Sequence, residues 1–153
     1  MFNGTANARC DSMPASFVID HQQRVVWSRG WGELVASDLE ATQNGVREDK
    51  NFDPMYRQLY DFSEVTDVFI SRAQLQSLAY SSPFSPAARR AIVVKSDMAF
   101  GMARMYSLIS DRDPEHFGIF RDRESALKWL GVSDTSLPER AGAEEDRQDV
   151  GAR

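Results

Sequence analysis

The stretch RAIVVKSDMAFGMARMYSLIS, residues 90–110, decides the fold class of this chain. It begins with an unbroken apolar run, RAIVVK, which is typical of a β-strand covered on both faces. Ser96 or Asp97 then provides a helix cap, and apolar residues recur at the helical spacing of three to four: Met98, Met102, Met105 and Ile109. A buried strand that leads into an amphipathic helix is one repeat of an α/β protein with a largely parallel sheet.

The same alternation extends from this stretch in both directions. We expect strands at 15–20, 24–30, 55–62, 90–95 and 116–121, and helices at 37–50, 71–80, 97–110 and 123–130. The short polar turn at 21–23 makes the first two strands an antiparallel hairpin, and the third strand is expected to be central. The order ββαβαβαβα predicts an α/β fold: a single-layer, mixed, mostly parallel five-stranded sheet packed with helices.

Two helix starts fit the S-x-x-E/Q capping box, in which the first and fourth side chains satisfy each other's free backbone N–H groups. One is Ser37 to Glu40, and the other is Ser71 to Gln74. Asp61 and Ser63 lie at the end of the third strand and are expected to form a turn. The segment 65–70 is a mixed connection that can itself be extended.

Composition bounds the domain and its partners. The chain has 153 residues, 42% hydrophobic and 27% charged, which suits one domain at 14–132. The polar ends are expected to be a disordered leader, 1–13, and a disordered charged tail, 133–153. A net charge of −5 argues against nucleic acid, and no apolar run approaches the ~18 residues of a membrane span. With Cys10 alone no internal disulfide can form, so we expect a cytoplasmic protein.

Catalytic motifs are missing from the sequence. The two histidines, His21 and His116, are expected at the surface, and there is no G-x-S-x-G, P-loop or G-x-G-x-x-G motif. A zinc site would need Asp20, His21, Glu115 and His116 to meet, which requires the first and fifth strands to be neighbours. We therefore expect no enzyme, no metal and no cofactor.

Polar and apolar side chains near strand ends and on the third helix form a candidate partner or ligand face. Its residues are Asp61, Ser63, Phe84, Arg89, Arg90, Phe100, Met102, Arg104 and Tyr106. Arg89 and Arg90 could clamp a phosphate or carboxylate, or be solvated or paired with the many acids. The methionine-rich helix suits either an adaptable binding surface or the core. Trp27 and Trp31 have two alternative roles: they pack in the core, or they form part of a homodimer interface.

The span 14–132 resembles the bacterial SpoIIAA-like, STAS/SEC14-type proteins. The resemblance lies in FDPMYRQLYDFSEVTD, SPFSPAARRAIVV, FGMARMY and FRDRESALKWLG. It implies a SpoIIAA-like fold and a regulatory or protein-binding role. In antagonist members a partner kinase phosphorylates a serine or threonine at the second helix start. Ser71 corresponds to that acceptor, but Phe69 or Ile70 replaces the preceding aspartate and Arg72 or Ala73 the following glycine.

Two functions follow from these patterns. The first is a non-enzymatic, STAS-like regulatory module that binds another protein around Ser71, the loop 81–86 and the third helix. The alternative, implied by the SEC14 side of the resemblance, is a small apolar-ligand or lipid-binding protein. Its pocket would lie between sheet and helices, lined by Phe84, Phe100, Met102 and Tyr106.

Overall fold

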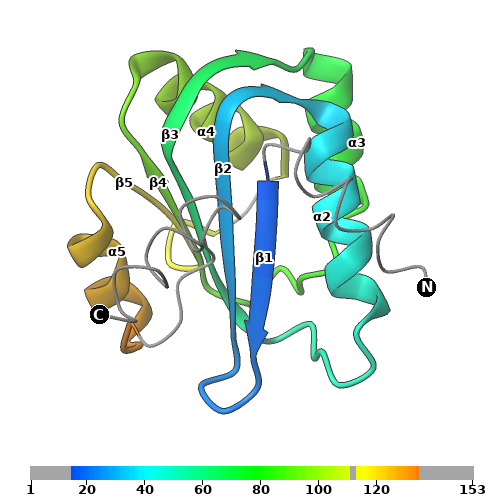
Figure 1. The fold of residues 1–153 in the computed structure, drawn as a ribbon, viewed down its shortest axis with the longest axis vertical. Coiled ribbons are helices and arrows are strands. Elements are labelled where there is room, and N and C mark those ends of the chain that lie inside the picture. The colour runs from blue at the N-terminus through cyan, green and yellow to red at the C-terminus, as the bar shows by residue number, and fades with distance from the viewer. Residues whose placement is uncertain (1–14, 111–112, 135–153) are drawn as a thin grey trace, which may run out of the picture.

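The computed structural model describes residues 15–110 and 113–134, which form one five-stranded sheet with four helices (Figure 1). The strands are β1 (Ala15–Asp20), β2 (Val25–Val35), β3 (Arg57–Phe69), β4 (Arg90–Val94) and β5 (Phe117–Phe120), and the helices are α2 (Ala36–Glu48), α3 (Arg72–Tyr80), α4 (Asp97–Ser110) and α5 (Arg123–Leu130). Only β1 is antiparallel to its neighbour. The expected fold class and element order are confirmed. The predicted leader, and the predicted tail beyond Asp134, lie outside the described residues.

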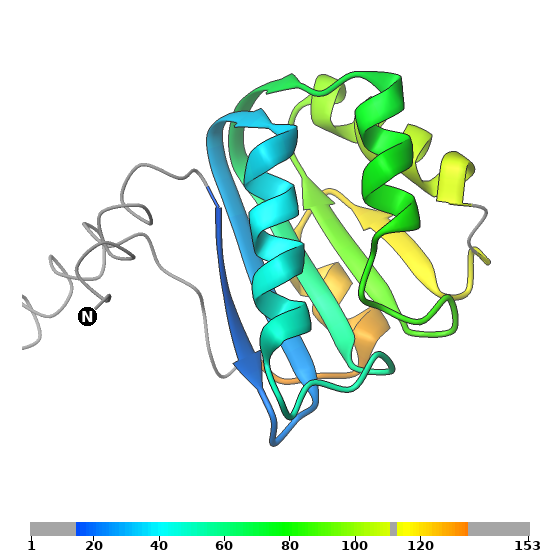
Figure 2. The same ribbon diagram turned by 90° about the vertical axis from the view of Figure 1, so that its right-hand side faces the viewer.

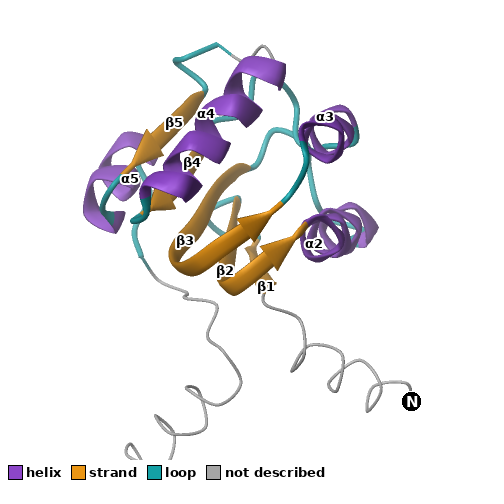
Figure 3. Ribbon diagram, turned by 90° about the horizontal axis from the view of Figure 1, so that it is seen from above, coloured by secondary structure: helices purple, strands orange, loops and turns teal. Residues whose placement is uncertain are grey.

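Helices α2, α3 and α4 cover one face of the sheet, and α5 lies on the other (Figures 2 and 3). The strand order follows the chain order, β1-β2-β3-β4-β5. Right-handed crossovers that all step in one direction place their helices on the same side, so α2, α3 and α4 form one layer. Helix α5 follows the last strand and packs back against β3, β4 and β5 from the opposite side.

The middle strands carry apolar side chains to both faces. All five residues of β4 are buried, as its unbroken apolar run predicts. Leu59 and Val93 face α5 and pack with its Leu130, whereas Tyr60 and Ile92 face the three-helix layer. Adjacent residues on a strand point to opposite faces, and this alternation assigns each candidate side chain to one of the two layers.

Strands β2 and β3 are longer than predicted. β3 continues through Phe69, so the expectation that Asp61 and Ser63 lie in a turn after the strand is wrong. Its register against β2 shifts just after Asp61, and there the Ser63 amide donates to Asp61 Oδ1 at 2.9 Å. Pairing of β3 with β4 ends at Phe62, so the segment 64–69 pairs with β2 alone. The turn-forming residues therefore mark a β-bulge within a strand.

The start of α2 also differs from the prediction. Because β2 runs to Val35, the helix begins at Ala36, and Ser37 is an exposed residue inside it. The Asp38 carboxylate accepts a hydrogen bond from the Val35 amide at 3.1 Å. The predicted Ser37 capping box is therefore wrong, and an aspartate in the first turn satisfies the free amide instead.

The second predicted capping box, at Ser71, is confirmed. Ser71 Oγ accepts from the Gln74 amide at 3.1 Å, and Gln74 Oε1 accepts from the Ser71 amide at 2.8 Å, which is a complete capping box. Helix α5 ends at Gly131 with a left-handed backbone, φ +73°. In the described ranges, no helix has the length and apolarity needed to cross a membrane.

Candidate functional site

The candidate face predicted from the sequence is not one surface in the structure. Phe84, Arg90, Met102 and Tyr106 line a cavity between the sheet and the three-helix layer. Asp61 and Ser63 lie on β3, with the Asp61 carboxylate bonded toward α5. The remaining residues, Ser71, Arg89, Phe100 and Arg104, lie outside both groups and are placed below.

The cavity measures about 90 Å³ and lies between the sheet and helices α2, α3 and α4. Most of its lining is apolar, from residues such as Leu39, Val68, Leu75, Leu78, Ile92 and Phe117. Its polar lining residues are Thr42, Gln43, Gln58, Tyr60 and Arg90. Phe100, which was predicted to line such a pocket, instead packs beside the core with the Arg121 guanidinium 4.5 Å from its ring centroid.

Arg90 is the most unusual residue of this cavity, because it is a cation with only 5% of its surface exposed. Its Nε donates to Gln58 Oε1 at 2.8 Å, and its Nη1 donates to the Tyr106 hydroxyl at 3.0 Å and to Ser82 Oγ at 3.4 Å. The ring of Phe84 lies 4.8 Å from the guanidinium carbon. All these partners are neutral, so the expected alternatives of a solvated or acid-paired arginine are both wrong for Arg90.

Gln58 extends the row of buried hydrogen bonds that begins at Arg90 across the sheet. Its Nε2 donates to Ser28 Oγ at 3.0 Å, and Ser28 and Gln58 are only 1% and 2% exposed. These hydrogen bonds therefore link β2, β3 and β4 to Tyr106 of α4 through buried side chains. Buried polar groups that satisfy one another in this way hold their side chains in one arrangement.

Tyr60 contributes a buried hydroxyl to the same cavity. The residue is 7% exposed, and within the described ranges its hydroxyl oxygen has no hydrogen-bond partner. The neighbouring Thr42 hydroxyl bonds to Asp38 O at 3.1 Å. Burial raises the pKa of the Tyr60 phenol above its ordinary value. The Thr42 hydroxyl lies close enough to offset this in part, although its geometry does not meet that of a hydrogen bond to Tyr60, and the Arg90 charge acts in the same direction. The phenol therefore keeps its proton and can act as a donor.

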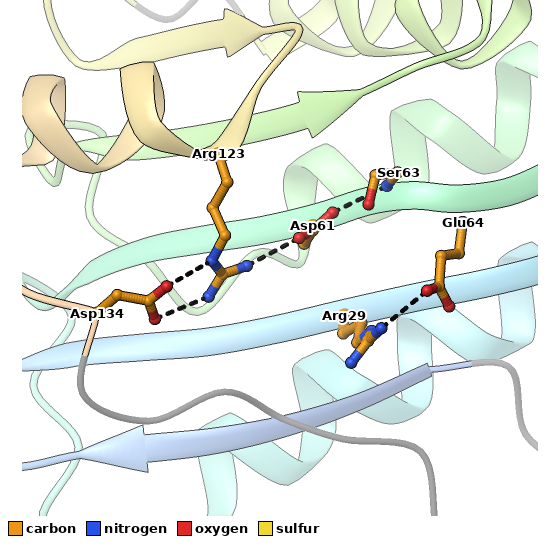
Figure 4. Close-up of polar contacts among 6 residues, drawn as sticks. All are labelled: Arg29, Asp61, Ser63, Glu64, Arg123 and Asp134. Atoms are coloured by element: carbon orange, nitrogen blue, oxygen red, sulfur yellow. Dashed lines mark hydrogen bonds and ion pairs between the residues drawn. The ribbon is translucent and has the colours of Figure 1, made fainter. Parts of the chain in front are cut away.

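The face covered by α5 holds a separate ionic network (Figure 4). Arg123 donates through Nη1 to Asp61 Oδ2 at 2.8 Å and through Nε to Asp134 Oδ2 at 2.9 Å. Nearby, Arg29 pairs with Glu64 at 3.0 Å. This network joins β3 to the start of α5 and to the segment that follows α5, which indicates a structural role for Asp61.

Arg89 points away from Arg90 because the two are adjacent at the start of a strand. Its guanidinium carbon lies 4.2 Å from the ring centroid of Trp129 on α5, and its Nε contacts Glu115 O at 3.4 Å. The two arginines therefore do not form one anion clamp. Trp27, proposed as an alternative interface residue, is fully buried in the core beneath α5.

A surface hollow of about 460 Å³ lies between the start of α3 and the outer side of α4. Its lining combines two arginines with apolar side chains: Arg72, Gly101, Arg104, Met105, Leu108 and Ile109. Leu108 is 76% exposed, and neither arginine forms an ion pair with a described residue. Ser71, the residue before Arg72, is exposed at the helix N-terminus.

The histidines lie at opposite ends of the sheet order. His21 Nδ1 is 2.8 Å from the Tyr56 hydroxyl and its Nε2 is 3.4 Å from Asp49 Oδ1, which ties the first hairpin to the loop before β3. His116 precedes β5, so the strands flanking the two histidines form opposite edges of the sheet. The zinc set considered from the sequence is therefore not brought together.

Gln58 and Tyr60 are two polar cavity residues on one strand that sequence reasoning missed. Both were placed in a strand, and their spacing of two residues puts them on one face. Gln58 is the polar member of a buried strand, QLY, next to an apolar β4 that begins with an arginine. A buried glutamine opposite an arginine was the available signal for an internal polar cluster.

No protein-family model and no curated protein matches this sequence. Among solved structures, the chain is similar to an uncharacterised DUF3478-family protein with a SpoIIAA-like fold from Shewanella loihica PV-4. The identity is 19% and the TM-score 0.54, over 76% of this chain and 93% of that one. An anti-sigma factor antagonist from Mycobacterium paratuberculosis aligns at 15% identity and TM-score 0.48, over 80% and 97%. The described chain has a SpoIIAA-like fold, as its sequence motifs predict.

Proposed function

We propose that this chain is a non-enzymatic, STAS-like regulatory module that binds another protein through the hollow between α3 and α4. The observation that carries the proposal is the composition of that hollow, in which apolar side chains lie beside two arginines without ion-pair partners among the described residues. A soluble domain rarely leaves a side chain such as Leu108 76% exposed beside other apolar groups without a use for them.

The lining of the hollow favours one kind of partner. Met105, Leu108 and Ile109 offer a flexible apolar floor, which suits the apolar face of an amphipathic helix. Arg72 and Arg104 flank this floor and would pair with carboxylates at the edge of such a helix. The proposed partner segment is therefore an acidic amphipathic helix.

Ser71 enters the proposal as a regulatory position. Its hydroxyl is exposed at the N-terminus of α3, where a phosphate would be favoured by the free amides and the helix dipole. A phosphate there would also lie beside Arg72 and compete with an acidic partner for it. Phosphorylation of Ser71 would then weaken partner binding, and mass spectrometry of the protein purified from its native cells tests whether this modification exists.

Comparative capture from the native host tests the docking proposal. The bait proteins are the unaltered chain, the variant Leu108→Asp, the double variant Arg72→Glu/Arg104→Glu, and Lys128→Glu as a control on α5. A protein retained by the unaltered chain and by the control, and lost by both hollow variants, is then purified and its affinity measured by calorimetry. Equal retention of every captured protein by all four baits would contradict the proposal.

A lipid is not included in this proposal. The volume of the cavity between the sheet and the three-helix layer, about 90 Å³, is well below the ~300–1,000 Å³ typical of small-molecule pockets. The cavity is too small for a lipid. If this protein binds a small molecule there, that molecule has to be much smaller, and the buried positive charge of Arg90 indicates its chemistry.

A further inference from the structure

Arg90 is a buried cation for which the described chain provides no carboxylate partner. It is 5% exposed, and its hydrogen bonds go to Gln58, Tyr106 and Ser82, all neutral. No ion pair of Arg90 with a described residue is formed. Burying a charge without a counter-charge is costly, so such an arginine points to an anion that is bound during function.

The cavity beside Arg90 has room for that anion. Arg90 and Tyr60 both line it, and the Tyr60 hydroxyl is a buried donor with no partner in the described residues. Arg90 Nη2 likewise makes no hydrogen bond to a described residue. Two residues that each keep a donor atom without a partner among the described residues, one of them charged, therefore line one small space.

The remaining walls select the shape of the ligand. They are made almost entirely of aliphatic and aromatic side chains from both layers. A volume of about 90 Å³ leaves room for only a few non-hydrogen atoms. This is enough for a carboxylate with a short alkyl chain and too little for a fatty acid or a nucleotide.

We propose that the cavity between the sheet and helices α2, α3 and α4 binds a short-chain carboxylate, such as acetate, propionate or butyrate. The carboxylate lies against Arg90, the Tyr60 hydroxyl donates to one of its oxygens, and the alkyl chain packs among the apolar walls. A guanidinium and a carboxylate match in charge and in planar geometry. A phosphate dianion would meet one cation and apolar walls that cannot solvate its third oxygen.

The test is a titration of the full chain followed by two-dimensional amide NMR. Acetate, propionate and butyrate are added to about 50 mM, because so small a ligand is expected to bind in the micromolar to millimolar range. Sodium chloride at matched ionic strength controls for charge screening. Propionamide, the neutral isostere of propionate, controls for filling of the cavity alone.

We expect saturable shifts of amides around the cavity with the carboxylates, affinity at least about tenfold weaker for propionamide, and no saturable shift with chloride. Equal binding of propionamide and propionate would overturn the proposal, because it would show a cavity indifferent to charge. Saturable shifts with chloride at these residues would also overturn it.

Substitutions of Arg90 and Tyr60 test whether these two donors bind the carboxylate. Tyr60→Phe removes an unpartnered hydroxyl without removing a hydrogen bond to a described residue, and we expect at least about tenfold weaker propionate binding. Arg90→Met is expected to abolish it, and Lys128→Gln on α5 is expected to leave it unchanged. If Arg90→Met does not fold, Tyr60→Phe decides alone, and unchanged affinity in that variant would refute the proposed site.

Discussion

Replacing Tyr60 with phenylalanine should stabilise the unliganded protein, which is unusual for a change in a buried core. The Tyr60 hydroxyl is buried and has no hydrogen-bond partner within the described ranges. Burying an unsatisfied polar group costs about 1–3 kcal/mol, so its removal should raise the free energy of unfolding by about 1 kcal/mol. The matched control is Tyr56→Phe, because Tyr56 is 6% exposed and its hydroxyl contacts His21 Nδ1 at 2.8 Å. That variant should lose about 1 kcal/mol.

The assay is urea unfolding followed by tryptophan fluorescence, in buffer free of small carboxylates. For a domain of this size, each kcal/mol shifts the melting temperature by about 4 °C, so calorimetry should separate the two variants by about 8 °C. The m-values should stay unchanged. If Tyr60→Phe destabilises the protein as much as Tyr56→Phe does, the Tyr60 hydroxyl has a partner and the reasoning is refuted.

Alkaline pH provides a second measurement on the same pair. Burial raises the pKa of Tyr60 above the ordinary value of about 10. Above about pH 10 the unfolded chain loses a proton that the folded protein keeps, so the free energy of unfolding falls as pH rises. Tyr60→Phe lacks this loss, and its advantage over the unaltered protein should grow above about pH 10. A constant advantage at all pH values would contradict the burial of the phenol.

Three further predictions concern helix ends. Ser71→Ala should cost about 1 kcal/mol in urea unfolding through the lost cap, whereas Ser37→Ala, inside α2, should be close to neutral; equal losses would contradict the assigned helix starts. Gly131→Ala, at φ +73°, should lower the melting temperature. Gly101→Ala should raise the free energy of unfolding by up to about 1 kcal/mol, because the new methyl group meets no described atom within 4 Å beyond its chain neighbours and its own helix backbone. The pKa of Asp122 is lowered because its carboxylate accepts from the amide and hydroxyl of Ser125, so its stabilising effect is present above its ordinary pKa of 3.8 and is lost as the pH falls through the lower folded value. Urea midpoints for Asp122→Asn should therefore fall less steeply below about pH 4 than those of the unaltered chain.

Local patterns predicted the elements whose signals are local. The apolar run at 90–95 and the Ser71 capping box each depend on a few neighbouring residues, and each was read correctly. The length of β3 was not readable in this way. The segment 65–70 looks mixed in the sequence, and its residues up to Phe69 are extended because β2 provides a partner from more than thirty positions earlier.

The candidate site was only partly predictable for a related reason. Phe84, Arg90, Met102 and Tyr106 do gather around one cavity. The adjacent arginines were considered together, but alternation along a strand sends Arg89 to α5 and Arg90 inward. The burial of Arg90 depends on Gln58 and Tyr106, which approach it only after the sheet and α4 have assembled.

The buried chain from Ser28 through Gln58 to Arg90 has a consequence for the alignment of the strands. A run such as AIVV would pack nearly as well after a slip by one pleat repeat, because its side chains are similar in size and polarity. Such a slip would separate Arg90 Nε from Gln58 Oε1, and the buried cation would lose this hydrogen bond. These buried hydrogen bonds thus favour one register of the three strands β2, β3 and β4 over its alternatives. Natural variation at Arg90 would then have to preserve strand register as well as whatever the cavity holds.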